Sequence, residues 1–286
     1  MQIFSQLLVL ASLAGGVFAW DSPTYSGYSK IWVDTFDGSA GQAPDTSKWN
    51  IITGYLNVNA EQEVYTASSN NIQRSGGATL QIVPQRDSSA LYGWTSGRVE
   101  SKYVLTPAAG KRTRMEAQIR FGTNAQANKQ GIWPAFWMLG NSLRNGGSWP
   151  ACGEIDIMER VNGIFTGYGT VHCNVYPGGI CNEGTGIGGS IGIPDDGWHT
   201  WRVDIDRAAS SWQSESITWY MDGTQFHQVT GSRIGNQAVW ATLAHSPLYF
   251  ILNLAVGGTW PGNANDATLG SWGAMMEVAY VAHYST

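Results

Sequence analysis

The sequence MEAQIRF, at residues 115–121, alternates apolar and polar side chains. Because successive side chains of a β-strand point to opposite faces, Met115, Ala117 and Ile119 are expected to face a core while their neighbours face the other way. The same period of two recurs at residues 201–206. Strands that are half-buried in this way are typical of antiparallel sheets.

Two further stretches extend this pattern. Residues 217–221 alternate again and lead into the dipeptide Asp222-Gly223, a strong signal for a β-hairpin. Residues 248–256, LYFILNLAV, are nearly all apolar, as expected of an interior strand covered on both faces. The chain has 36 glycines between many short strands and little helical periodicity. We therefore predict an all-β fold in one domain, with two antiparallel sheets packed face to face and one of them curved.

The chain carries little charge. Its formal net charge is −5, and charged residues make up 13% of it, against about 25% in an average globular protein. Lys and Arg form no basic helix and no long basic run, so the sequence gives no support to binding of nucleic acid through counterion release. We expect no nucleic-acid partner.

The first 19 residues have the pattern of an export signal. They are mostly apolar, too short to span a membrane, and end in the small residues Val17 and Ala19, although no Lys or Arg precedes the apolar run. We predict a signal peptide at 1–19 and one domain at 20–286. The mature chain is then secreted, extracellular or in a cell wall, with no membrane attachment.

Three cysteines are present in the sequence. In an oxidising compartment Cys173 and Cys181 can close a small loop, which leaves Cys152 unpaired. The simpler interpretation of Cys152 is a buried, inert side chain, and a reactive thiol or another pairing is the alternative. The cysteine spacing matches no zinc site, and we expect no metal.

The strongest local signal for chemistry is WPACGEIDIME, at residues 149–159, with three carboxylates within six residues. On a regular strand Glu154 and Asp156 share one face, but Glu159 lies out of phase with them. One extra residue near Ile157 would bring Glu159 back to that face, so we predict a β-bulge there.

With this bulge the two glutamates can flank a sugar. Retaining glycosidases use such a pair, one carboxylate attacking the anomeric carbon and the other protonating the leaving oxygen. Crowding of like charges also raises at least one carboxyl pKa, which keeps an acid protonated. The alternatives are an exposed acidic strand or a calcium loop, but the intervening isoleucines favour a packed sheet.

The segment GEIDIME, at 153–159, resembles the active-site signature of glycoside hydrolase family 16 in its bulged, laminarinase-type form. Three other segments resemble the family in the expected order: TSGRVESK at 95–102, GIWPAFWML at 131–139 and FILNLAVGGTWPG at 250–262. Together they span residues 95–262, which is most of the predicted mature chain.

The resemblance implies a β-jelly-roll sandwich with a concave glycan-binding cleft and retaining hydrolysis of β-1,3- or mixed β-1,3/1,4-glucan. It implies Glu154 as nucleophile, Asp156 as its support and Glu159 as general acid/base. We expect a β-glucan polysaccharide or oligosaccharide as substrate, no cofactor, and a monomer.

Other residues are substrate-binding candidates. His172 matches a family histidine near the acids, and Arg98 resembles a family residue on the glycone side. The stretch with Asn59 and Glu63 resembles one that lines the same side. The remaining candidates are Trp133, Trp149 and Trp260, which adjoin Gly, Pro or polar residues, and Asn253, the polar exception in its strand. Trp137, Trp201 and Trp219 are expected in the core.

The closing strand departs from the family pattern. It reads MEVAYVAHY, so Ala279 occupies the position of an aspartate that commonly binds a structural calcium ion, and Ala282 replaces an arginine. Glu277 is at best a substitute ligand. We predict no well-formed calcium site.

Two other functions are compatible with the sequence. Transglycosylation uses the same covalent intermediate and differs only in the acceptor. A glycan-binding protein on the same fold would recognise glucan without cutting it, although such relatives lose one or both glutamates. Motifs also leave open whether the backbone is β-1,3-glucan, mixed-linkage glucan or galactan.

Overall fold

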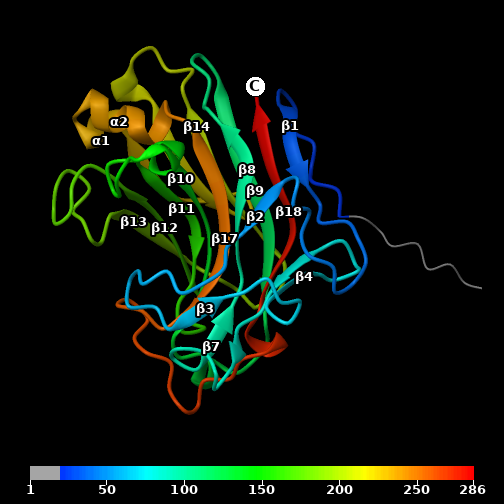
Figure 1. Cartoon of the computed structure of the whole chain (residues 1–286). Helices are drawn as coiled ribbons and strands as arrows, with labels where there is room; N and C mark the ends of the chain where they lie inside the picture. Colours follow the sequence, from blue (N-terminus) through cyan, green and yellow to red (C-terminus); the bar gives the residue numbers. More distant parts are fainter. Residues whose placement is uncertain (1–19) are drawn as a thin grey trace, which may run out of the picture.

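The computed structural model describes residues 20–286, so the predicted signal peptide at 1–19 lies outside the described residues. The described part consists mainly of two large antiparallel sheets with few helices (Figure 1). This confirms the predicted all-β sandwich. No helix among residues 20–286 has the length and apolar character needed to cross a membrane.

One sheet, named here the cleft sheet, has seven strands. Their order is β13 (Ile187–Gly192), β12 (Thr166–His172), β11 (Glu154–Glu159), β10 (Ile132–Gly140), β17 (Leu248–Val256), β8 (Arg98–Leu105) and β2 (Trp49–Ile51). All nine residues of β17 are buried, as the apolar run predicts. This strand lies in the interior of the sheet, between β10 and β8.

The second sheet, named the outer sheet, has eight strands. Their order is β16 (Thr224–Thr230), β15 (Ser216–Met221), β14 (His199–Asp206), β9 (Arg112–Phe121), β18 (Met276–Ser285), β5 (Leu80–Ile82) and β4 (Ile72–Arg74), with β1 (Ser29–Asp34) paired to β18. The turn between β15 and β16 is Asp222-Gly223, and both residues have positive φ, as a tight hairpin requires.

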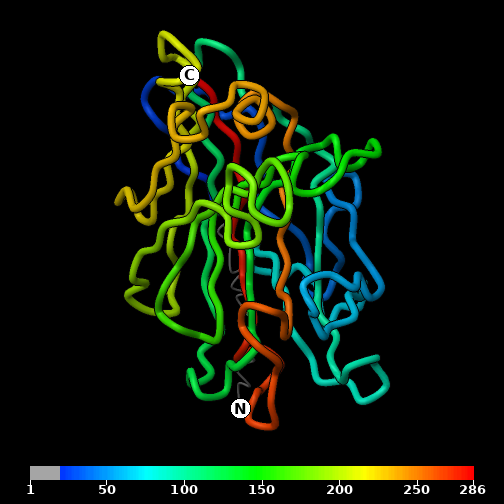
Figure 2. Tube along the Cα trace, turned by 90° about the vertical axis from the view of Figure 1, so that its left-hand side faces the viewer, coloured from blue at the N-terminus to red at the C-terminus, as the bar shows by residue number. Residues whose placement is uncertain are grey.

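Smaller elements cover the two ends of the sandwich. Helices α1 (Gly231–Ile234) and α2 (Gln237–Ala244) lie together at one end, and the loop 257–271 extends to the other (Figures 1 and 2). A small sheet joins β3 (Glu63–Tyr65), β7 (Trp94–Ser96) and β6 (Gln85–Arg86), with the β3–β7 pair parallel. Four short 3₁₀ helices are η1 (Gln126–Asn128), η2 (Asn141–Asn145), η3 (Trp212–Ser214) and η4 (Trp272–Ala274).

The hydrophobic core joins the two sheets, and glycines in β12 make room for it. Trp201 and Trp219, from the outer sheet, are fully buried, as predicted. A Cβ atom on Gly167 would lie 2.1 Å from the Trp201 ring, and one on Gly169 would lie 2.4 Å from the Trp219 ring. Only glycine at these two positions lets the indoles pack directly on the strand that carries part of the site.

Candidate active site

Strand β11 contains a bulge where the sequence predicts one. Its pairing with β10 joins Trp137 to Asp156 and then Phe136 to Met158, so Ile157 has no partner there. The register of the β11–β12 pairing also shifts here, between Asp156 and Glu159. The extra residue restores the phase, and Glu159 lies on the cleft face together with Glu154 and Asp156.

The core holds this bulge from behind. Ile155 and Ile157 are fully buried in the core between the sheets. The indole Nε1 of Trp219 donates a hydrogen bond to the backbone carbonyl of Asp156 at 2.7 Å. A core tryptophan of the outer sheet therefore fixes the backbone at the point where the strand bulges.

Two adjoining hollows form the cleft above the acids. The first, of about 310 Å³, is named here the Arg98 hollow, and the second, of about 690 Å³, is named the Trp260 hollow, each after a residue that lines only that one. Five residues line both hollows: Asn59, Trp133, Trp149, Glu154 and Glu159. The two glutamates therefore stand at the junction, where a chain lying through both hollows would be cut.

Each glutamate receives a hydrogen bond from an indole. Trp133 Nε1 donates to Glu159 Oε1 at 3.0 Å, and Trp149 Nε1 donates to Glu154 Oε2 at 3.0 Å. Trp149 is 40% exposed, so its ring can also meet a sugar. The predicted cleft tryptophans thus orient the acids as well as lining the cleft.

The acids differ in how strongly their surroundings oppose ionisation. Burial raises the pKa of Glu159 to about 7, and the negative charge of Glu154 adds to this rise, whereas the Trp133 hydrogen bond and the charge of His172 oppose it. Burial also raises the pKa of Glu154, against the charge of His172 and the Trp149 hydrogen bond. Glu159 can therefore hold a proton in mildly acidic solution, as a general acid must.

Asp156 and His172 complete the group of charges. Burial, followed by the charges of Glu154 and Glu159, raises the pKa of Asp156 well above its usual range, so its surroundings favour the protonated form. Its Oδ2 atom is buried and has no hydrogen-bond partner among the described residues. His172 Nε2 lies 3.4 Å from Asp156 Oδ2 and 3.9 Å from Glu154 Oε1.

The Arg98 hollow has a wall of ordered polar groups. Arg98 is buried and forms a salt bridge with Glu100, with 2.8 Å between Nη2 and Oε1. Its guanidinium carbon lies 5.0 Å from the centre of the Trp137 ring. Asn253 accepts a hydrogen bond from Trp137 Nε1 at 2.7 Å and donates one to Tyr65 at 3.0 Å. Asn253 therefore orients the Trp137 ring, which lines the cleft.

Two expectations about this wall are not met. Trp137, expected in the core, lines the Arg98 hollow, because every second residue of a strand faces the same side and Trp137 lies four residues after Trp133. Glu63 does not line either hollow: it is 2% exposed, and it accepts a hydrogen bond from the backbone of Val256 at 2.7 Å. Glu61, two residues earlier and missed from the sequence, lines the hollow instead.

The remaining candidates lie on the other side of the acids. Trp260 lines the larger hollow, is 45% exposed, and packs edge-on against Trp133 with ring centres 5.6 Å apart. The glycine-rich stretch 184–190 also lines the Trp260 hollow, and no sequence motif predicted its role there.

The predicted cysteine pairing is confirmed. Cys173 and Cys181 form a disulfide, and Cys152 is free and buried.

A cation would find one group of suitable ligands among residues 20–286. Glu154, Asp156 and His172 offer ligand atoms within 4.8 Å of one another, but all three residues line the cleft, Asp156 in the Arg98 hollow and His172 in the Trp260 hollow, so an ion there would compete with substrate. On the outer sheet Ala279 is fully buried, and the Glu277 carboxylate already accepts hydrogen bonds from Thr79 and Arg120.

Known proteins resemble this chain over most of its length. The family model described as glycosyl hydrolases family 16 matches residues 58–281. A glucan endo-1,3-beta-glucosidase A1 of Niallia circulans is 33% identical over 92% of this chain, which spans 38% of that relative. A beta-glucanase of Rhodothermus marinus is 32% identical over 89% of this chain, which spans 84% of it.

A solved structure resembles this one closely. The endo-1,3-beta-glucanase from Streptomyces sioyaensis superposes with a TM-score of 0.86 at 36% sequence identity, covering 93% of this chain and 99% of that one. The similarity therefore extends over nearly all of the chain, both sheets included.

Proposed function

The chain belongs to the glycosyl hydrolases of family 16, and from that premise we propose that it is a retaining endo-β-glucanase acting on β-1,3- or mixed β-1,3/1,4-glucan. One observation carries the proposal: two glutamates stand at the junction of two hollows, and one of them has a pKa of about 7. An open cleft on both sides of the acids suits cleavage inside a chain.

In the first step Glu159 donates its proton to the glycosidic oxygen while the Glu154 carboxylate attacks the anomeric carbon. The bond to the leaving sugar breaks and a glycosyl ester on Glu154 forms. In the second step the Glu159 carboxylate takes a proton from water, the resulting oxygen nucleophile displaces Glu154, and both acids return to their starting states.

The surroundings support these roles. Donation from Trp149 favours the ionised form of Glu154, which a nucleophile requires, whereas the burial of Glu159 favours its protonated form. A neutral Asp156 beside Glu154 can donate a hydrogen bond that orients the nucleophile before attack and stabilises its released carboxylate afterwards.

The Arg98 hollow suits the glycone side. The half-buried face of Trp137 offers a stacking surface, and Arg98, Asn59 and Glu61 bring donors and acceptors for hydroxyl groups. The Trp260 hollow then receives the departing part of the chain. We infer that the enzyme is exported and works as a monomer, and the Cys173–Cys181 disulfide supports an oxidising destination.

The test is a panel of laminarin, lichenan, barley-type glucan, agarose and xyloglucan, assayed for reducing ends with the purified enzyme. We expect cleavage of laminarin and at least one mixed-linkage glucan, and the first product should keep the β-anomer in a proton NMR time course. Glu154→Ser should lose turnover while retaining glucan binding. Reducing-sugar release by this variant at near wild-type rate would refute the assignment.

Transglycosylation is the second candidate, and the size of the Trp260 hollow, about 690 Å³, favours it because that space could hold an acceptor sugar. The acceptor hydroxyl would then replace water in the second step. Incubation with a single laminari-oligosaccharide decides between the two outcomes, since products longer than the substrate arise only by transfer.

A further inference from the structure

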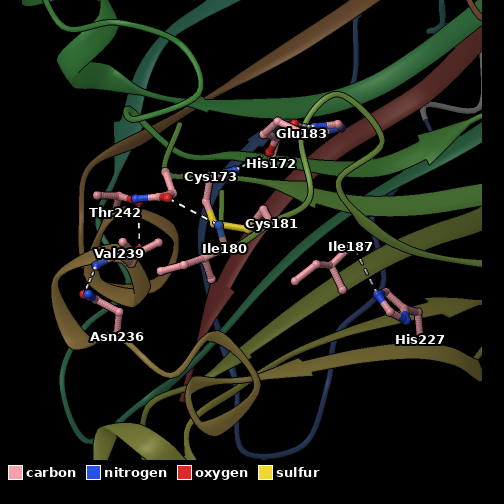
Figure 3. Close-up of a disulfide and its surroundings, with 11 residues drawn as sticks. His172, Cys173, Ile180, Cys181, Glu183, Ile187, His227, Asn236, Val239 and Thr242 are labelled. Atoms are coloured by element: carbon pink, nitrogen blue, oxygen red, sulfur yellow. Dashed lines mark hydrogen bonds and ion pairs between the residues drawn. A yellow bond between two sulfur atoms is a disulfide. The ribbon is translucent and has the colours of Figure 1, made fainter. Parts of the chain in front are cut away.

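A buried carboxylate outside the acidic motif contacts the site histidine. Glu183 belongs to the loop between β12 and β13, and its side chain is 0% exposed. Its Oε2 atom lies 2.6 Å from His172 Nδ1, and its Oε1 accepts a hydrogen bond from the backbone N–H of Cys173 at 2.7 Å. Both oxygens are thus committed to two consecutive residues at the end of β12 (Figure 3).

The opposite edge of the same imidazole faces the acids. Because the Glu183 carboxylate accepts from Nδ1–H, a neutral His172 presents the lone pair of Nε2 to Asp156 and Glu154, and a protonated one presents N–H. The Trp149 ring packs on this imidazole with ring centres 5.8 Å apart. Rotation or a change of tautomer would alter what the nucleophile and its supporting aspartate contact.

The loop holds Glu183 firmly in this position. The disulfide between Cys173 and Cys181 is fully buried and begins next to His172. Backbone hydrogen bonds of 2.5 and 2.6 Å join Gly178 and Glu183 across the loop. The chain then passes so close to the imidazole that a Cβ atom on Gly186 would lie 2.9 Å from His172 Cε1.

The charge environment agrees with a functional contact. Burial by itself lowers the pKa of His172, but the Glu183 hydrogen bond and the charges of Glu154, Glu183 and Glu159 outweigh it, so the pKa lies above its usual value. Burying a carboxylate carries a desolvation cost that a well-placed partner must offset. Here that partner is a side chain of the active site.

From this geometry we propose that Glu183 is a positioning residue for the active site: it fixes the orientation and tautomer of His172 so that Nε2 stays directed at Asp156 and Glu154. The proposal rests on the glucanase function proposed above. A merely structural Glu183 would stabilise the loop and leave the catalytic steps unchanged.

The first experiment compares Glu183→Gln with a matched control, Glu215→Gln. Glu215 is also a buried carboxylate bonded to a histidine, 2.5 Å from His245 Nε2, and it lines neither hollow. On laminarin we expect Glu183→Gln to lower kcat about 10- to 100-fold with KM within about twofold of wild type. The control should keep the wild-type kcat even where it lowers the melting temperature.

A double-mutant cycle shows whether Glu183 acts through the imidazole. His172→Gln should lower kcat, and adding Glu183→Gln to it should lower kcat by less than about twofold more. An undiminished loss in the His172→Gln background would overturn the proposal, as would a Glu183→Gln enzyme with wild-type kcat and pH profile.

A spectroscopic readout does not depend on turnover. Nitrogen-15 NMR of the ligand-free protein should show His172 protonated at Nδ1 in the wild type and a lower imidazole pKa in Glu183→Gln. The groups facing this imidazole are Glu154, Asp156 and Glu159 on β11, and Glu183 on the loop. Identical spectra in both proteins would refute positioning. If the spectra differ but the wild type cuts no glucan, the positioning holds and the proposed function fails.

Discussion

Replacing the proposed general acid, Glu159, with Gln should stabilise the folded protein at alkaline pH. The side chain is buried, and its pKa rises from 4.5 to about 7 on folding. Glutamine keeps the size of the side chain and an acceptor for the Trp133 indole, but it cannot ionise. The variant therefore removes one specific cost from the folded state.

The size of the effect follows from the pKa values. The unfolded chain loses the Glu159 proton near pH 4.5 and the folded chain only near pH 7, so stability falls with rising pH across this window and is level above it. One pKa unit corresponds to about 1.4 kcal/mol, which makes the full loss about 3 kcal/mol. We expect Glu159→Gln to gain about 3 kcal/mol over wild type at pH 8 and under about 1 kcal/mol at pH 5.

The assay is denaturant unfolding of both proteins at pH 5 and pH 8, with the disulfide kept oxidised. Glu215→Gln is the control, since it replaces one of two buried acceptor oxygens, which serve Arg207 on one side and Trp240 and His245 on the other, away from the cleft, and should destabilise at both pH values. Equal effects of Glu159→Gln at the two pH values would refute a raised pKa, and with it the physical basis of the acid role.

Three further predictions follow from the same structure. The value of kcat/KM should decline as pH rises through about 7, because Glu159 loses the proton it must donate, and a flat profile to pH 9 would contradict this role. Trp137→Ala should raise KM for laminari-oligosaccharides roughly five- to tenfold, because the lost stacking contributes about 1 kcal/mol to binding. Trp272 lies outside both hollows, so Trp272→Ala should leave KM unchanged. Gly169→Ala should lower the free energy of unfolding by about 1–3 kcal/mol, because its Cβ would enter a core indole, whereas Gly192→Ala meets open space and should be neutral in the same denaturation assay.

Local patterns predict much of the fold because the chain's periodicities are strong. Alternation at 115–121 and the apolar run at 248–256 correspond to β9 and β17, and Asp222-Gly223 forms the hairpin turn. The bulge is also readable from the sequence, since a spacing of five between Glu154 and Glu159 cannot share one strand face without an extra residue.

Strand phase explains one prediction that the structure corrected. Its apolar neighbours predict Trp137 in the core, yet it lies an even number of residues after Trp133 on the same strand, so both side chains face the cleft. In a strand covered on both faces, hydrophobicity does not distinguish the core side from the substrate side. Counting residues from Trp133 would have placed Trp137 correctly.

The sheet-rich architecture and the spacing of the three acids can be read from the chain alone, because both depend on residues close together in it. The packing of distant segments sets two other features: Glu61 rather than Glu63 lines the cleft, and Glu183 contacts the Nδ1 edge of His172. Glu63 contacts the end of β17 and Glu183 contacts the end of β12. Such contacts depend on how distant segments pack, and no local periodicity records them.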